Sequence, residues 1–294
     1  MDYNNLPPTP DSGTGNRSIV SGSDSRLNVQ STEYRMHLGK RNIYIYDESP
    51  PQSVKNFGLD IIDGKRNSPE ADDNFVQGFV RAARRCEASP EDLIREELGP
   101  AILPTIADMP ANLTRSSNQP WTKHMDLAFD PSVLVRSPRL PHPKPDHGYG
   151  YHKSAFARTQ YGAIDQFRDP EDNRYSAPES MPQIYAPCFV VEYVTQKNKG
   201  THHKATSQNA HAGVLILRSM DELWKALKKS ETIPLGFSVF LSISMDHEVM
   251  RINCHWLKVA PKQPVEYHMA VLKAYLTSNE DMVRQLRTAI RNLV

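Results

Sequence analysis

The 294-residue chain has little of several features that would point to a familiar class of protein. Its only three cysteines, Cys86, Cys188 and Cys254, lie far apart and form no C-x-x-C pair. This scarcity argues against a disulfide framework or a cysteine-based zinc site, and it fits a reduced intracellular compartment, nuclear or cytoplasmic. The formal net charge is +1, so overall charge gives no reason to expect a nucleic-acid partner. Neither a secretory leader nor a long apolar run is present, so we expect no membrane association.

Apolar residues are also scarce. They make up 38% of the chain, the mean hydropathy is −0.58, and there are 23 prolines, which together indicate that part of the chain does not pack. Residues 1–30 are rich in Ser, Gly, Asn and Pro, and we expect them to form a disordered tail. We expect residues 31–140 to form an N-terminal arm and helical region that packs on a core, and residues 141–294 to form that core.

Hydrophobic periodicity supplies the fold class. Alternating or continuous apolar runs predict strands, and spacing of three to four residues predicts helices. The order of these elements predicts an α/β (α+β) domain with a mixed central sheet flanked by helices. We expect a loop at 103–120 and a helix break near Ser219, where Ser219-Met220-Asp221-Glu222 resembles a capping box. The predicted strands cover 42–46, 188–191, 237–244, 249–259 and 266–276, and the predicted helices cover 70–86, 89–98, 203–229 and 280–293.

Two isolated carboxylates are the most suggestive chemical feature. Glu192 ends the apolar run Cys188–Val191, and Asp146 follows a proline at the start of an edge-like strand or extended arm. Burying a charge is costly unless a partner or a ligand compensates for it. The alternative for Asp146 is a turn or cap residue, and for Glu192 a salt-bridged strand end. Glu96 and Glu97 are expected on the surface, although either would be a further acid if it faced this site.

Histidines offer a second possible metal site. Imidazole is a common ligand of transition metals, and His202, His203 and His211 fall within one predicted helix. His203 and His211 are about two helical turns apart, which is too far for one ion. We therefore interpret them as exposed or hydrogen-bonded side chains.

The order of three short motifs resembles a fungal domain family of unknown function that is related to the PD-(D/E)XK restriction-endonuclease-like superfamily. The motifs are Pro145-Asp146 followed by Gly148-Tyr149-Gly150-Tyr151, the strand Phe189-Val190-Val191-Glu192, and Ala205-Thr206-Ser207-Gln208 at the start of a helix. The resemblance covers most of residues 34–294. It implies a restriction-endonuclease-like fold.

The resemblance also implies a chemistry, metal-assisted hydrolysis of phosphodiesters. Asp146 and Glu192 would hold Mg²⁺ or Mn²⁺, since hard cations prefer oxygen ligands. Gln208 would face the same site. Nucleic acid would then be the expected partner, while protein partners and oligomeric state are left open.

One position departs from this pattern. The superfamily has a lysine two residues after the second acid, and Val194 occupies that position here. Strand alternation points Glu192 and Val194 to the same face. Lys204, just before the helix, is a candidate for a relocated catalytic lysine. Val194 and the near-neutral net charge favour a degenerate domain that is kept as a nucleic-acid or protein interaction module and needs no cofactor. The alternative is an active metal-dependent nuclease.

Overall fold

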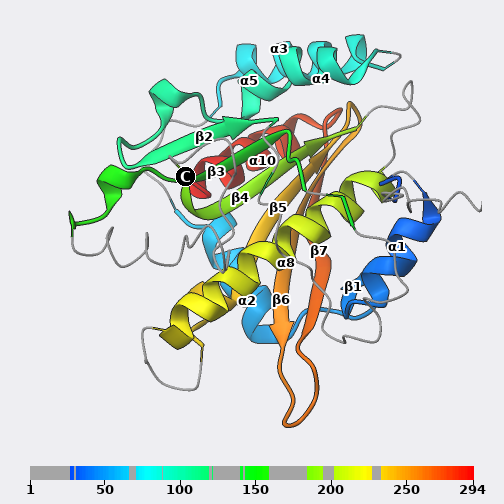
Figure 1. The fold of residues 1–294 in the computed structure, drawn as a ribbon. Helices are drawn as coiled ribbons and strands as arrows, with labels where there is room; N and C mark the ends of the chain where they lie inside the picture. The colour runs from blue at the N-terminus through cyan, green and yellow to red at the C-terminus, as the bar shows by residue number, and fades with distance from the viewer. Residues whose placement is uncertain are drawn as a thin grey trace, which may run out of the picture.

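A single seven-stranded mixed sheet organises the molecule, in the order β1-β7-β6-β5-β4-β3-β2 (Figure 1). The β1–β7 and β4–β5 pairs are parallel and the other four are antiparallel. The strands are β1 (Ile43–Ile45), β2 (Leu113–Ser117), β3 (His147–Tyr151), β4 (Tyr185–Tyr193), β5 (Val239–Met245), β6 (Val249–Lys258) and β7 (Glu266–Leu276). The computed structural model describes residues 27–29, 31–65, 71–87, 89–118, 121, 140–141, 143–158, 184–194, 202–226 and 233–294.

One face of the sheet is covered by the long helix α8 (His202–Ala226), which crosses it diagonally in Figure 1, with α1 (Thr32–Gly39) beside it. The core on this face joins α8 side chains such as Val214 and Leu217 to Val190 and Phe240 of the sheet. Because side chains alternate along a strand, Val190 and Glu192 of β4 share this face.

Helices α2, α3 and α10 cover the opposite face, where the larger core forms. Their amphipathic sequences explain this placement: α10 buries Val283, Leu286 and Ile290, while its arginines are only half-buried. These three helices are α2 (Gln52–Ile62), α3 (Asp73–Arg85) and α10 (Glu280–Asn292). The remaining helices are α4 (Glu91–Glu97), α5 (Gly99–Ile102) and α9 (Leu235–Ser238), and the 3₁₀ turns are η1 (Ile106–Asp108) and η2 (Lys153–Ala155).

A close approach between α8 and the sheet fixes the position of this helix. A Cβ on Gly213 would lie 2.3 Å from Nδ1 of His255, so only glycine fits there. His255 is fully buried on β6 and shares a 2.8 Å hydrogen bond with the Ser242 hydroxyl of β5. The Asn209 amide also donates to the Ile243 carbonyl at 3.1 Å. These contacts determine where the first turns of α8, including residue 204, meet the sheet.

The mixed sheet with flanking helices confirms the predicted fold class, and three local predictions were wrong. The segment 103–120 contains β2, and β3 is therefore an inner strand and not an edge. No break occurs at Ser219, whose hydroxyl donates to the Leu215 carbonyl inside a continuous α8. The predicted helix at 89–98 is α4, which ends at Glu97, and a further short helix, α5, begins at Gly99. Residues 1–26 of the predicted tail lie outside the described residues.

None of the helices in the described part of the chain has both the length and the apolar composition needed to cross a membrane.

Candidate functional site

The register of β3 and β4 brings the two predicted acids together. His147 pairs with Val191 and Gly148 with Val190 in antiparallel register. One step further along the same register, Asp146 falls opposite Glu192. Both side chains are buried, with exposed fractions of 6% and 3%. Two carboxylates 46 positions apart in sequence thus meet at one end of the sheet.

Burial makes both acids harder to ionise. Burial raises the pKa of Glu192 well above its ordinary value, and the negative charge of Asp146 raises it further. Burial also raises the pKa of Asp146, against the opposing effects of the Tyr193 amide and the Arg95 guanidinium. Perturbed carboxylates of this kind are typical of functional sites, although structural ion-pair networks also produce them.

Arg95, which the sequence analysis did not single out, is the direct partner of Asp146. Its guanidinium donates to Oδ1 of Asp146 at 2.6 Å, while the Tyr193 amide donates to Oδ2 at 2.8 Å. The same guanidinium reaches Glu91, one turn earlier on α4, at 3.2 Å, and it lies 5.6 Å from the centre of the Tyr193 ring. Asp146 is therefore held from both the helix α4 and the end of β4.

Lys204 lies in the first turn of α8, the helix that covers the sheet face to which Glu192 belongs. Its positive charge lowers the pKa of both Asp146 and Glu192, although burial outweighs this effect at each. Gln208 is half-buried one helical turn further along α8, on the same side of the helix as Lys204. Val194 is 2% exposed and its amide donates to the Met245 carbonyl at 2.9 Å, so the side chain two residues after Glu192 is apolar and buried.

The N-terminal segment also reaches this site. Tyr34 of α1 is buried, and its hydroxyl shares a 2.8 Å hydrogen bond with Nδ1 of His211 on α8. Burial raises the pKa of Tyr34, and the nearby charge of Glu192 raises it further. His211 is thus a hydrogen-bonded core residue, as expected. His202 anchors the start of α8 through Asp246, 2.9 Å away.

The donor set can be compared with the needs of a Mg²⁺ ion. Mg²⁺ usually keeps several waters and binds through one or two carboxylates, which Asp146 and Glu192 would supply. Each Asp146 oxygen already accepts one hydrogen bond, but a carboxylate oxygen has a further lone pair. Within the described residues, no group of three or more His, Cys, Asp and Glu side chains is placed to hold a metal. The acid pair could therefore supply two carboxylate ligands to a hard cation, and it does not form a closed protein cage.

Glu91 and Arg95 are the site residues that sequence reasoning missed. Glu96 and Glu97, which it considered instead, are exposed, and Glu97 pairs with Arg85 at the surface. The available signal was an acid and a base four residues apart on a short helix, which is usually only a surface pair. Nothing in that spacing shows that α4 ends beside β4.

We expect Glu192→Gln to raise the free energy of unfolding at pH 7 by about 1 to 3 kcal/mol, because an amide costs less to bury than a carboxylate. A raised pKa means that the folded protein holds a proton that the unfolded chain releases. The wild type gains stability from this protonation fully below the unfolded pKa, near 4.5, and loses it as the pH rises through the folded pKa. The difference in free energy of unfolding between Glu192→Gln and the wild type should therefore shrink as the pH falls from 7 to 4.5.

Urea unfolding at several pH values measures this difference. Glu97→Gln, which removes an exposed carboxylate, is the matched control and should change stability by less than about 0.5 kcal/mol. A Glu192→Gln variant that is less stable than wild type at pH 7 would contradict the direction of the pKa shift.

These features define an α+β domain with a buried pair of acids at one end of a mixed sheet, flanked by an arginine and a lysine. The chain belongs to the family described as a domain of unknown function, DUF7924, whose model matches residues 78–294. No curated protein matches the chain.

Proposed function

We propose that this domain is a metal-dependent phosphodiesterase of the nuclease type, with Asp146 and Glu192 as the metal-binding acids and Lys204 as a relocated catalytic lysine. The observation that supports the proposal is that α8 begins beside the acids: His202, two residues before Lys204, lies 3.4 Å from the hydroxyl of Ser244, the β5 residue that pairs with Glu192. Lys204 would then replace the lysine that the resemblance leads us to expect at position 194.

Each residue would have a separate task. When bound, Mg²⁺ supplies positive charge to the phosphate and lowers the pKa of a coordinated water. The Lys204 ammonium would stabilise negative charge that develops on the phosphate oxygens. Gln208, one turn away, would offer an amide donor to the same substrate. Tyr34 and His211 would keep α8 in place through their hydrogen bond.

Calorimetric titration with Mg²⁺ and Mn²⁺ tests the metal assignment. We expect one site at millimolar or lower concentration in the wild type, an affinity at least about tenfold lower in Glu192→Gln, and unchanged affinity in Glu97→Gln. The absence of binding at millimolar metal in the wild type would overturn the proposal.

Cleavage assays on single- and double-stranded DNA and RNA test the role of the lysine. Lys204→Met should abolish metal-dependent cleavage while leaving metal binding in place. Lys225→Met is the matched control because Lys225 lies on the same helix, is 66% exposed and pairs only with Asp221 among the described residues. Equal activity in both variants would exclude Lys204 as the catalytic lysine.

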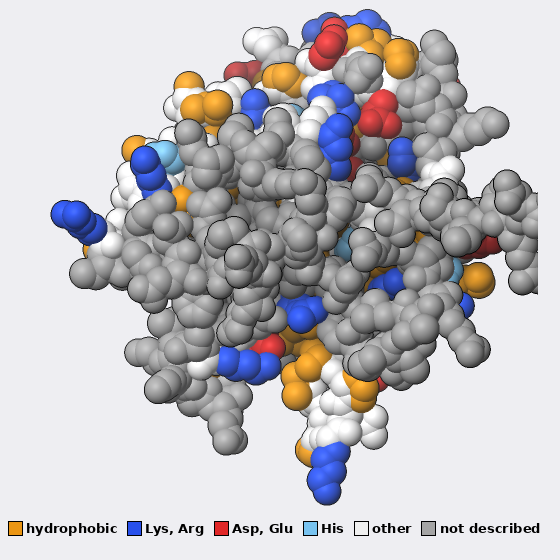
Figure 2. Space-filling model, in the orientation of Figure 1, with side chains coloured by type: hydrophobic (Ala, Val, Ile, Leu, Met, Phe, Trp, Pro, Cys, Tyr) orange, Lys and Arg blue, Asp and Glu red, His pale blue; other side chains and the backbone are white. Residues whose placement is uncertain are grey.

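A second candidate function is a non-cleaving interaction module with the same fold. Two observations favour it: Val194 fills the usual lysine position, and Arg95 already neutralises Asp146. On the face shown in Figure 2, the coloured Lys and Arg side chains are scattered and form no continuous stripe among the described residues. This function predicts no cleavage by the wild type, and binding of partners that neither Mg²⁺ nor a chelator changes.

A further inference from the structure

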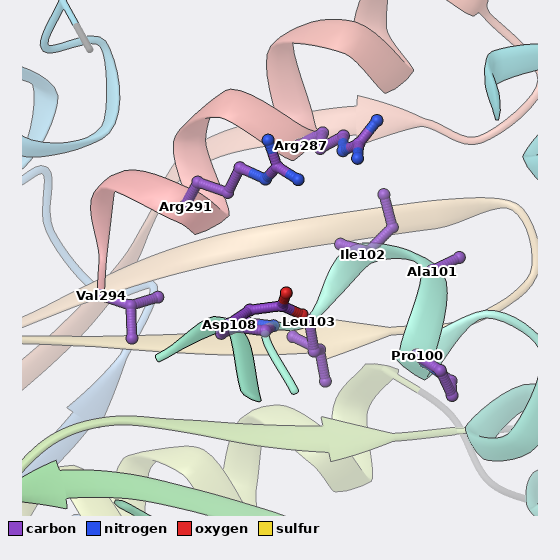
Figure 3. A pocket seen from close by; sticks show the side chains of 9 residues that line it. Pro100, Ala101, Ile102, Leu103, Asp108, Arg287, Arg291 and Val294 are labelled. Atoms are coloured by element: carbon purple, nitrogen blue, oxygen red, sulfur yellow. The ribbon is translucent and has the colours of Figure 1, made fainter. Parts of the chain in front are cut away.

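A cavity of about 320 Å³ lies between the C-terminal helix and the α5 segment, among residues outside the acidic site. Arg287 and Arg291, one turn apart on α10, form one wall (Figure 3). Pro100, which is exposed, and Ala101, which is half-buried, contribute apolar surface opposite them, and Asp108 lies beside Leu103. The cavity thus combines two guanidinium groups with an apolar wall.

Both guanidinium groups are available to a ligand. Within the described part of the chain, neither Arg287 nor Arg291 makes an ion pair or a side-chain hydrogen bond. Arg287 lies 3.9 Å from the centre of the Phe75 ring, which limits the orientations of its planar group. Burial lowers the pKa of Arg287, and the charge of Arg291 lowers it further. Two positive charges one helical turn apart repel each other, and an anion bound between them would relieve that repulsion.

Asp108 does not serve as that anion in the structure. Its carboxylate accepts hydrogen bonds from the Thr105 hydroxyl at 2.7 Å and the Thr105 amide at 3.2 Å, which together form a capping box around η1. These two bonds are the main reason why the pKa of Asp108 is lowered, and the two arginines contribute less. Asp108 therefore stays charged near the cavity while its hydrogen bonds go to its own turn.

We propose that this cavity binds a phosphate monoester, with the phosphate between Arg287 and Arg291 and the organic group against Pro100 and Ala101. A carboxylate can be saturated by one bidentate guanidinium, whereas the three terminal oxygens of a phosphate can accept donors from two. A monoester also carries a charge of about −1.5 to −2 at pH 7, which matches two guanidinium groups better than a single negative charge does. The apolar wall favours an ester over the free ion.

Isothermal titration of the full chain with phenyl phosphate, inorganic phosphate and phenol tests the proposal. Phenyl phosphate should bind most tightly, inorganic phosphate more weakly, and phenol not measurably. Arg291→Met and Arg287→Met should each weaken phenyl phosphate binding by about tenfold or more, since each removes charge-assisted hydrogen bonds. Asp108→Asn should strengthen it by several-fold, because it removes a repulsive charge and keeps an oxygen for Thr105.

Lys55→Met is the charge-matched control, because Lys55 is exposed on α2 and does not line the cavity, and it should leave the affinity unchanged. A phosphoserine amide tested beside phenyl phosphate separates two sources of the monoester, a phosphorylated side chain and a small molecule with an apolar body. Tighter binding of the phosphoserine amide would remove the role of the apolar wall. Equal affinity in wild type, Arg287→Met and Arg291→Met would overturn the site, whatever the outcome at Asp146 and Glu192.

Discussion

Arg95→Met is expected to lower the free energy of unfolding by about 3 kcal/mol at pH 7, because it removes the cation from a largely buried ion pair. The Arg95 and Asp146 side chains are only 22% and 9% exposed, so water cannot replace the guanidinium well. Methionine keeps most of the aliphatic stem that packs near the Tyr193 ring. The loss should therefore report mainly on the Asp146 carboxylate.

The pH dependence separates this explanation from lost packing. Arg95 lowers the pKa of Asp146, so its removal should raise that pKa further. The destabilisation should then shrink as the pH falls and Asp146 becomes protonated, whereas a packing loss would not change with pH. Urea unfolding between pH 4 and 8 measures the stability loss and its pH dependence. Arg85→Met is the control, because Arg85 and Glu97 form an exposed ion pair. Equal losses in the two variants would contradict the buried-pair interpretation.

The same variant connects stability to the proposed function. If Asp146 and Glu192 take a divalent cation, the metal and the Arg95 guanidinium would compete for Asp146, since both approach its carboxylate oxygens. Millimolar Mg²⁺ should then restore part of the stability lost in Arg95→Met and do less for the wild type. Without a metal site, the stability loss would be the same with and without Mg²⁺.

Gly213→Ala is expected to destabilise the domain by about 3 kcal/mol, because the new methyl would overlap the His255 imidazole. The ring has little freedom to move away, since it is buried and hydrogen-bonded to Ser242. Relief would require α8 to shift from the sheet, and Lys204 would move with it. Metal-dependent cleavage measured beside thermal unfolding should therefore weaken in the same variant, while metal binding should not change.

Gly78→Ala makes the matched comparison on α3. A Cβ there meets no atom within 4 Å, so this change should stabilise the helix by about 0.5 to 1 kcal/mol through reduced backbone freedom in the unfolded chain. The two substitutions are chemically identical, and the structure predicts opposite signs for them. A loss below about 1 kcal/mol at Gly213 would mean that α8 is less firmly placed than its contacts indicate.

The sequence was most informative where burial produces a regular pattern. Strands β5 to β7 and helix α10 follow from alternation and from helical spacing, because one face of each packs against the core. The strand β2 was missed because Leu113–Ser117 has a single large apolar residue, so its pairing with β3 leaves no periodic signal. The break at Ser219 was wrong because the hydroxyl bonds to a carbonyl within the helix and does not cap a new one.

The acidic site shows the same limit. Asp146 and Glu192 could be singled out because a lone carboxylate beside a buried strand is unusual, and the structure places them in facing positions. Arg95 could not be found, because its role depends on where α4 lies relative to β4, which is set by tertiary packing. The cavity between α10 and α5 was missed for the same reason, since Arg287 and Asp108 are far apart in sequence.

The short strand β1 limits how far the N-terminus of this domain can be truncated. The family match begins at residue 78, but β1 pairs with β7 through hydrogen bonds from the Tyr46 amide to Met269 and from the Tyr267 amide to Asn42. A fragment limited to the matched residues would leave these β7 groups unpaired along an open sheet edge. An unpaired strand edge can form hydrogen bonds with a strand of another molecule. The segment before residue 78, which contains β1, therefore protects β7 from intermolecular strand pairing.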